Sequence, residues 1–87
     1  MAEVRIYTTP TCGYCHAALS LLRAKGVTFE HIDVSRDPAM RRRLVELTGS
    51  TTVPQIFIDG QPIGGFTDML SLERRGELAP MLASNAG

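Results

Sequence analysis

The sequence predicts an α/β domain with a four-stranded mixed sheet flanked by helices, in the order β-α-β-α-β-β-α. Short runs rich in β-branched and aromatic residues alternate with longer runs whose apolar residues recur every three or four positions. A helix between the first two strands implies that they are parallel, because a parallel pair needs a crossover connection. Asp59-Gly60, between the last two strands, favours a tight turn that makes those strands antiparallel.

The first strand and first helix are predicted on either side of a short loop. Residues 3–8 alternate between polar and apolar side chains and are rich in β-formers. A helix is then expected from about Gly13 to Lys25, with Thr11 as its N-cap and Gly26 ending it. Its expected buried stripe consists of Cys15, Ala18, Leu19 and Leu22.

A second strand is predicted over residues 27–34, followed by a second helix. Asp37 caps this helix, Pro38 takes its first turn, and the helix runs to Thr48 before Gly49 ends it. We expect its inward side chains to be Leu44 and Leu47, its solvated ones Arg42 and Arg43, and an ion pair to join Arg42 to Glu46.

The last two strands cover residues 55–58 and 61–63. Pro62 has no N–H to donate to a ladder, so the fourth strand should lie at an edge of the sheet. A third helix is expected to run to Arg74, with Thr67 or Asp68 as its cap. The remainder comprises the helix stop Gly76, an amphipathic turn with Leu78, Met81 and Leu82, and a tail at 83–87 that we expect to fray.

Length and charge exclude several classes of protein. The 87 residues are expected to form a single domain over 1–87. Nine basic and nine acidic residues give zero net charge, which argues against nucleic acid or an anionic membrane as a partner. The sequence has neither a transmembrane-length apolar run nor the basic and apolar regions of a secretory signal. We therefore expect a cytoplasmic protein, where a close cysteine pair is more often catalytic or metal-binding than structural.

Cys12 and Cys15 are the only cysteines, and they lie where the first strand gives way to the first helix. At a helix N-terminus, unpaired N–H groups and the helix dipole favour negative charge. A thiol held there ionises more easily, and the thiolate is the reactive form. Cys15 lies one turn further in and is expected to keep the higher pKa. The pair is therefore predicted to carry redox chemistry.

The motif by itself leaves two other chemistries open, zinc binding and haem attachment. A zinc site needs about four ligands, and His16 and His31 are the remaining obvious nitrogen donors. Cys15-His16 also completes the C-x-x-C-H string of c-type haem attachment, which would require an export signal and a mostly helical chain. We favour neither: His16 is expected to be exposed in the first helical turn, and His31 to lie on a strand surface. A structural disulfide here would close too small a loop to stabilise the fold much.

Several separated motifs together point to one family. In order they are Ile6-Tyr7-Thr8, Cys12-x-Tyr14-Cys15, Thr52-Val53-Pro54-Gln55-Ile56-Phe57-Ile58, Gly64-Gly65 followed by Asp68, and Arg75-Gly76-x-Leu78-x-Pro80. With these motifs the chain resembles the glutaredoxins, most closely the small bacterial dithiol members, over about residues 3–82. The resemblance implies a thioredoxin-like fold, which agrees with the predicted order of elements.

The resemblance implies glutathione-dependent thiol–disulfide exchange, with glutathione as co-substrate. Cys12 would be the nucleophile that takes glutathione from a protein–glutathione mixed disulfide, and a second glutathione would release it. With a protein disulfide as substrate, Cys15 would resolve the intermediate by forming a Cys12–Cys15 disulfide. The implied partners are glutathionylated or disulfide-containing proteins, and we expect the chain to be a monomer.

The resemblance also implies a glutathione site. Val53, before a cis Pro54, would pair with the cysteine part of glutathione like an added strand, and Thr52 would help to shape the same wall. Tyr14 would flank the sulfur, and Arg41 would meet the glycine carboxylate. The γ-glutamyl group would bind at a helix start, an expected kind of anion site, formed by Gly65, Phe66, Thr67 and Asp68.

Three residues depart from the family pattern. Gly13 takes the place of a frequent proline, and Thr9 and Thr51 replace frequent basic residues. With less positive charge nearby, we expect a less acidic Cys12 and weaker carboxylate binding. Some relatives that lack the proline hold a [2Fe–2S] cluster between two subunits, so such a dimer is the alternative function. If such a cluster is bound, Cys12 would be its ligand in this chain. Apart from that cluster, no metal site is predicted.

A third possibility is a thioredoxin-like enzyme that a flavoprotein reductase reduces. The sequence has no Trp before the cysteines. Its Thr52-Val53-Pro54 and Gly64-Gly65-x-x-Asp68 segments are of the glutathione type. Both observations argue against this possibility.

Overall fold

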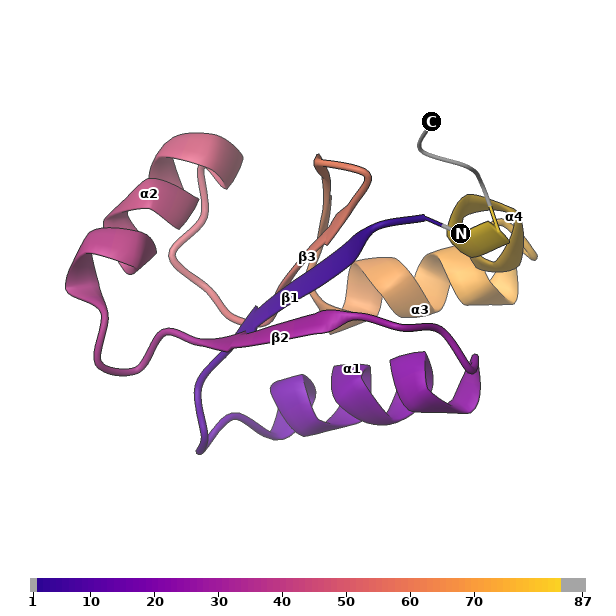
Figure 1. Cartoon of the computed structure of the whole chain (residues 1–87), viewed down its shortest axis with the longest axis horizontal. Helices are drawn as coiled ribbons and strands as arrows, with labels where there is room; N and C mark the ends of the chain where they lie inside the picture. Colours follow the sequence, from indigo (N-terminus) through magenta and orange to yellow (C-terminus); the bar gives the residue numbers. More distant parts are fainter. Residues whose placement is uncertain (1, 84–87) are drawn as a thin grey trace.

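The computed structural model describes residues 2–83 and contains eight elements in the predicted order (Figure 1). They are β1 (Val4–Thr8), α1 (Gly13–Ala24), β2 (Glu30–Asp33), α2 (Pro38–Thr48), β3 (Gln55–Ile58), β4 (Gln61–Gly64), α3 (Phe66–Arg74) and α4 (Leu78–Ala83). The predicted final amphipathic turn is α4. Ala83, which we expected in the frayed tail, ends this helix, and the rest of that tail lies outside the described residues.

The four strands form one mixed sheet in the order β2-β1-β3-β4. β1 and β2 are parallel, as the helical crossover predicts, with Ile6 opposite His31. β3 runs antiparallel to both β1 and β4. The predicted edge position of the Pro62 strand is confirmed, because β4 pairs only with β3. The order places β1, which leads to Cys12, directly beside β3, which follows Pro54.

Helices cover both faces of the sheet, with α1 and α3 on one side and α2 on the other (Figure 1). The larger core contains the buried stripe predicted for α1, apart from Cys15, which is buried as well. Tyr7, Val34, Leu44 and Phe57 form the smaller core under α2, where the rings of Tyr7 and Phe57 pack edge to face with centroids 5.6 Å apart. These two cores hold the ends of β1 and β3 in place from opposite sides.

Two local predictions are wrong because tertiary packing overrides them. β2 begins at Glu30 rather than at residue 27, and Val27 and Phe29 pack on the larger core from outside the ladder. Leu47 is 50% exposed, because α2 packs on the small core through the buried Leu44 and the partly buried Met40 instead.

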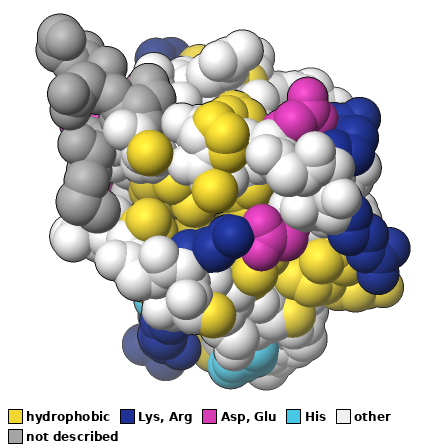
Figure 2. All heavy atoms as spheres, turned by 90° about the vertical axis from the view of Figure 1, so that its right-hand side faces the viewer, with side chains coloured by type: hydrophobic (Ala, Val, Ile, Leu, Met, Phe, Trp, Pro, Cys, Tyr) yellow, Lys and Arg dark blue, Asp and Glu magenta, His cyan; other side chains and the backbone are white. Residues whose placement is uncertain are grey.

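Ion pairs and surface charges lie around these cores. Lys25, at the end of α1, pairs with Glu73 of α3 at 2.6 Å and so joins the two helices. Figure 2 shows the end of the molecule near α4, where hydrophobic side chains gather among basic and acidic ones. The predicted Arg42–Glu46 pair is not the one found, since Glu46 lies 3.7 Å from Arg43 instead.

No helix in residues 2–83 is long and apolar enough to cross a membrane.

The predicted cap of α2 is confirmed, and it yields a stability prediction. Asp37 Oδ1 accepts a hydrogen bond from Met40 N at 3.0 Å. We expect Asp37→Ala to lower the free energy of unfolding by about 1 kcal/mol, because one amide of the first turn loses its acceptor. Urea denaturation of Asp37→Ala and Asp37→Ser measures this, and the serine variant should keep most of the stability. Equal losses in both variants would contradict the capping role.

Candidate active site

Cys12 is itself the N-cap of α1. Its extended backbone (φ −92°, ψ 114°) precedes the first helical residue, and its sulfur accepts a hydrogen bond from Cys15 N at 3.1 Å. Our prediction that Thr11 caps this helix is therefore wrong: a large, polarisable sulfur takes the place usually filled by an oxygen. The sulfur lies at the end of the helix where negative charge is stabilised.

Cys15 is held in a different environment on the same helix. It is 1% exposed, and both cysteines are free thiols. Burial, with a further contribution from the neighbouring Cys12, raises the pKa of the Cys15 thiol from 9.0 to about 12. The predicted asymmetry between an accessible first sulfur and a shielded second one is thus present in the structure, where Cys12 is half-buried.

This asymmetry predicts selective alkylation. At about pH 8 the Cys15 thiolate should amount to about one part in ten thousand, so iodoacetamide should modify Cys12 and leave Cys15 intact. The fold favours the neutral Cys15 thiol, so its contribution to stability is complete below about pH 9 and is lost as the pH rises toward 12. Peptide mass spectrometry and unfolding curves at several pH values measure the two effects. Equal labelling of the cysteines at about pH 8 would contradict the assignment.

The segment before β3 forms the wall opposite Cys12. The Val53–Pro54 bond is cis, as the resemblance implies. The Cys12 thiol donates to the carbonyl oxygen of Val53 at 3.5 Å, across 41 positions of sequence. Pro54 is buried and Thr52 is exposed. One residue of the predicted glutathione wall, Val53, therefore contacts the sulfur through its backbone, between the exposed Thr52 and the buried Pro54.

Gln55, to which the sequence motifs assign no separate role, supports this wall. Its side chain is 3% exposed, and its Nε2 donates to the carbonyl oxygen of Thr52 at 2.9 Å and to Thr52 Oγ1 at 3.3 Å. Thr52 is held from its other side by Ser50, whose hydroxyl lies 2.8 Å from Thr52 Oγ1. The signal in the sequence is a polar residue, Gln55, at the start of the apolar run Ile-Phe-Ile. A polar side chain buried at such a position needs hydrogen-bond partners and can therefore hold a neighbouring segment in place.

The start of α3 forms the third side of the site. Gly65 is the N-cap, and its N–H donates to Asp68 Oδ2 at 2.9 Å in a capping-box arrangement. Our prediction of Thr67 or Asp68 as the N-cap is wrong, because both lie inside the first turn. The carboxylate of Asp68 already binds the N–H of Gly65. The amides of Phe66 and Thr67 lie within the first turn, where backbone donors lack a partner inside the helix.

Two aromatic residues that the sequence treats separately meet at the edge of the site. The rings of Tyr14 and Phe66 stack with centroids 6.1 Å apart and planes inclined by 24°. Tyr14 is 63% exposed and Phe66 is half-buried. The stack bridges the N-terminal turns of α1 and α3.

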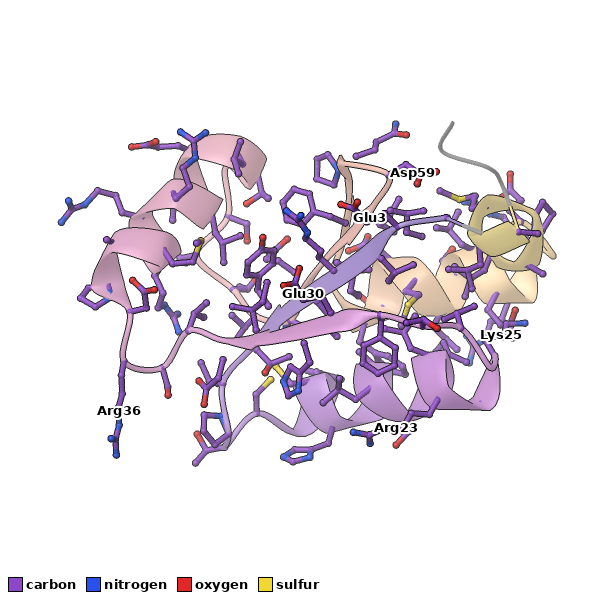
Figure 3. All side chains as sticks on the ribbon, viewed as in Figure 1. Glu3, Arg23, Lys25, Glu30, Arg36 and Asp59 are labelled. Carbon is purple, nitrogen blue, oxygen red and sulfur yellow. The ribbon has the colours of Figure 1, made fainter. Side chains whose placement is uncertain are left out.

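Arg41 differs from its two arginine neighbours. Its Nη2 donates to the carbonyl oxygen of Thr51 at 3.3 Å, and its side chain is half-buried. It is also close enough that its charge lowers the pKa of Cys15, against the larger effect of burial. Arg42 and Arg43 are exposed, as predicted. Arg36, at the approach to α2, points into solvent away from the fold (Figure 3).

A cavity of about 370 Å³ lies between the end of α2, the segment before β3, β4 and the start of α3. Three residues of the predicted glutathione site line it, namely Thr52, Gly65 and Asp68. Cys12 does not line it, so this cavity extends the site away from the sulfur. Within residues 2–83, no three His, Cys, Asp or Glu side chains come together as a metal-binding group.

Comparison with known proteins agrees with this geometry. The glutaredoxin family model matches residues 4–63. Glutaredoxin 3 of Escherichia coli (strain K12) is 50% identical over 82 residues, which cover 94% of this chain and 99% of that protein. The glutaredoxin of Pseudomonas aeruginosa is 45% identical over 84 residues, covering 97% of this chain and all of that protein.

Solved structures show the same fold. A crystal structure of a buckwheat glutaredoxin–glutathione complex superposes with a TM-score of 0.88 at 31% identity, covering 93% of this chain and 76% of that one. The solution structure of glutaredoxin from Brucella melitensis gives a TM-score of 0.85 at 44% identity, covering 94% and 89%. The predicted thioredoxin-like fold is confirmed by these structures together with the sheet described above. With its Cys12–Cys15 dithiol at the start of α1, the chain belongs to the glutaredoxin family of thiol–disulfide oxidoreductases.

Proposed function

We propose that this protein reduces protein–glutathione mixed disulfides with Cys12 as the nucleophile. The Cys12 thiolate attacks the glutathione sulfur, the disulfide bond between that sulfur and the substrate protein's cysteine breaks, and the protein thiolate leaves and takes a proton. The thiolate of a second glutathione then attacks the glutathione sulfur held on Cys12. Oxidised glutathione leaves and the Cys12 thiolate is restored, so the free glutathione is the reductant and the protein cysteine is the group reduced.

A protein disulfide would follow a second route. Cys12 attacks one sulfur of the substrate, and the other sulfur leaves as a thiolate. Cys15 then loses its proton and attacks Cys12, which releases the substrate and closes the Cys12–Cys15 disulfide. Because burial raises the pKa of Cys15 to about 12, the thiol stays protonated until this step.

The contact between Cys12 and Val53 is the observation that carries the proposal. The carbonyl oxygen of Val53 lies 3.5 Å from Cys12 Sγ. An extended peptide that pairs with the backbone of Val53, as an added strand would, brings its own cysteine side chain close to this sulfur. Glutathione is such a peptide, and a structural relative of this chain is a glutaredoxin–glutathione complex.

Each charged group of glutathione would meet a protein group that favours its charge. We assign the γ-glutamyl carboxylate to the amides of Phe66 and Thr67 at the start of α3, where the helix dipole favours an anion. Gly65 would belong to the same helix-start site, Asp68 would meet the γ-glutamyl ammonium, and Thr52 and Pro54 would shape the wall beside Val53. Arg41, which donates to Thr51 through one nitrogen, has further N–H groups for the glycine carboxylate.

The glutathione mixed-disulfide assay tests both routes in one experiment. We expect Cys15→Ser to keep deglutathionylation but to lose reduction of protein disulfides, because only the second route uses Cys15. Wild-type protein should turn over with glutathione and glutathione reductase and not with thioredoxin reductase. Turnover that depends on thioredoxin reductase would instead support the thioredoxin-like alternative.

A [2Fe–2S] cluster held between two subunits is the second candidate, and it is suggested by Gly13, which takes the place of a frequent proline. Gly13, next to the half-buried Cys12, is exposed, and a Cβ there would meet no atom within 4 Å apart from those of its chain neighbours. Cys12 would supply one cluster ligand, and glutathione and a second subunit the others. Anaerobic reconstitution with iron, sulfide and glutathione tests this, with Gly13→Pro as the closed variant. A colourless wild-type monomer would exclude the cluster. A brown colour in the wild type that is absent from Gly13→Pro would support it.

We propose a cytoplasmic monomer whose partners are glutathione and glutathionylated or disulfide-containing proteins. The balanced charge supports partners other than nucleic acid or anionic membranes. Sedimentation analysis of the reduced protein should give a single species of about the mass of one chain.

A further inference from the structure

Both histidines of the chain hold the segment that leads into Cys12. His31, on β2, places Nε2 2.6 Å from the hydroxyl of Thr8, the last residue of β1. His16, on α1, places Nε2 3.0 Å from the carbonyl oxygen of Pro10. A carbonyl oxygen only accepts, so the Nε2 of His16 carries the hydrogen in this bond.

This segment has few other anchors. Pro10 has no N–H to donate, and residues 9–11 lie between β1 and α1, outside the ladder. Thr8 is 3% exposed, so its hydroxyl is largely removed from water and depends on the histidine for a partner. Its carbonyl oxygen accepts from Val34 N at 2.9 Å. The two imidazoles therefore supply the side-chain anchors at positions 8 and 10.

Thr9, which lies between the two anchored residues, contacts both cysteines through its backbone. Its carbonyl oxygen accepts a hydrogen bond from Cys12 N at 3.4 Å. A backbone hydrogen bond from Thr9 lowers the pKa of Cys15, against the larger effect of burial. A shift of Thr9 would thus move the N-cap residue and change the environment of the second sulfur together.

We propose that His16 and His31 are positioning residues for the redox pair, which hold Thr9 between them so that Cys12 keeps its place at the N-cap of α1. This role rests on the proposed function of the pair, but it concerns the reactivity of the cysteines and not glutathione binding. The hydrogen bonds of the two histidines go to the Thr8 hydroxyl and the Pro10 carbonyl oxygen, so each acts on Cys12 through the segment from Thr8 to Cys12.

The rate of Cys12 alkylation by iodoacetamide tests the proposal without any need for glutathione. We expect Thr8→Val and His31→Leu each to slow it by about threefold to tenfold, the range that corresponds to one lost hydrogen bond. The double variant should be no slower than either single one, because both remove the same bond. Thr8→Ser, which keeps the hydroxyl, should restore the wild-type rate.

The bond from His16 is tested by rescue, because its acceptor is a backbone carbonyl. His16→Leu should slow alkylation by a similar factor, and His16→Gln, whose amide can donate to the same oxygen, should recover most of the rate. In the mixed-disulfide assay the leucine variants should lower kcat with little change in the KM for glutathione. The potential of the Cys12–Cys15 disulfide should shift in the same variants.

Arg23→Gln is the matched control, because Arg23 lies on the outer face of α1 and points away from the sheet (Figure 3). It should react like the wild type. Circular dichroism and melting curves identify any variant that fails to fold. If a valine or leucine variant does not fold, the rates of Thr8→Ser and His16→Gln test the proposal. Wild-type alkylation rates in folded Thr8→Val and His16→Leu would overturn the proposal. Slowed alkylation with no turnover in the wild type would instead contradict the proposed function and leave the positioning role intact.

Discussion

Cys12→Ser is expected to abolish deglutathionylation, with a loss of about a thousandfold or more, as when other enzymes lose their nucleophile. A serine oxygen at the N-cap can still accept the hydrogen bond from Cys15 N, so the helix keeps its cap. It ionises far less readily than a thiol and cannot form a disulfide with glutathione. The mixed-disulfide assay should therefore show no turnover, while the melting temperature should stay close to that of the wild type.

Cys15→Ser is the matched control for this variant, since it also replaces sulfur by oxygen on α1. It should keep the monothiol reaction. Deglutathionylation by Cys12→Ser at the wild-type rate would disprove the assignment of the nucleophile. Loss of activity in both variants would mean that even the mixed-disulfide reaction needs the second cysteine.

Gly64→Ala should give the second large effect, on stability and glutathione binding together. Gly64 has φ +113°, a conformation that L-residues rarely adopt, and an added Cβ would collide with the Asp68 carboxylate, lying 2.8 Å from its Cγ. Backbone strain and overpacking together should cost about 2–4 kcal/mol in the free energy of unfolding. Displacing Asp68 also frees the N–H of Gly65 and disturbs the start of α3.

The same displacement should raise the KM for glutathione by about tenfold, which corresponds to the loss of one charge-assisted hydrogen bond. Gly26→Ala is the control, because Gly26 also has positive φ (+70°) but a Cβ there meets no atom within 4 Å. It should lose stability through strain alone, by about 1 kcal/mol, and keep its KM. Equal KM values in the two variants would argue against a role for Asp68 in binding.

Local patterns predict most of the fold. The period of the apolar residues and the turn at Asp59-Gly60 predict the order of the elements and the antiparallel β3–β4 pair. The cap at Asp37 follows from residues next to one another in the chain. Two of the wrong predictions, for Leu47 and for the start of β2, concern places where burial depends on what lies opposite rather than on local spacing.

The candidate site divides in the same way. Two motifs of the site can be recognised in the sequence, the Cys12–Cys15 pair and Val53–Pro54. The family resemblance implies their roles. The support from Gln55, the stack of Tyr14 on Phe66 and the anchoring histidines have no motif of their own. They depend on contacts between elements, which single-sequence patterns do not encode.

The sequence by itself determined the class of fold, the redox pair and its position at a helix start, because these depend on residues within a few positions of one another. Only the tertiary structure decided that the sulfur of Cys12 serves as the cap and faces the carbonyl oxygen of Val53. That contact exists because the sheet order sets β1 beside β3, which joins residues 41 positions apart. Burial in the packed interior likewise decided that the Cys15 thiol stays protonated while Cys12 remains accessible.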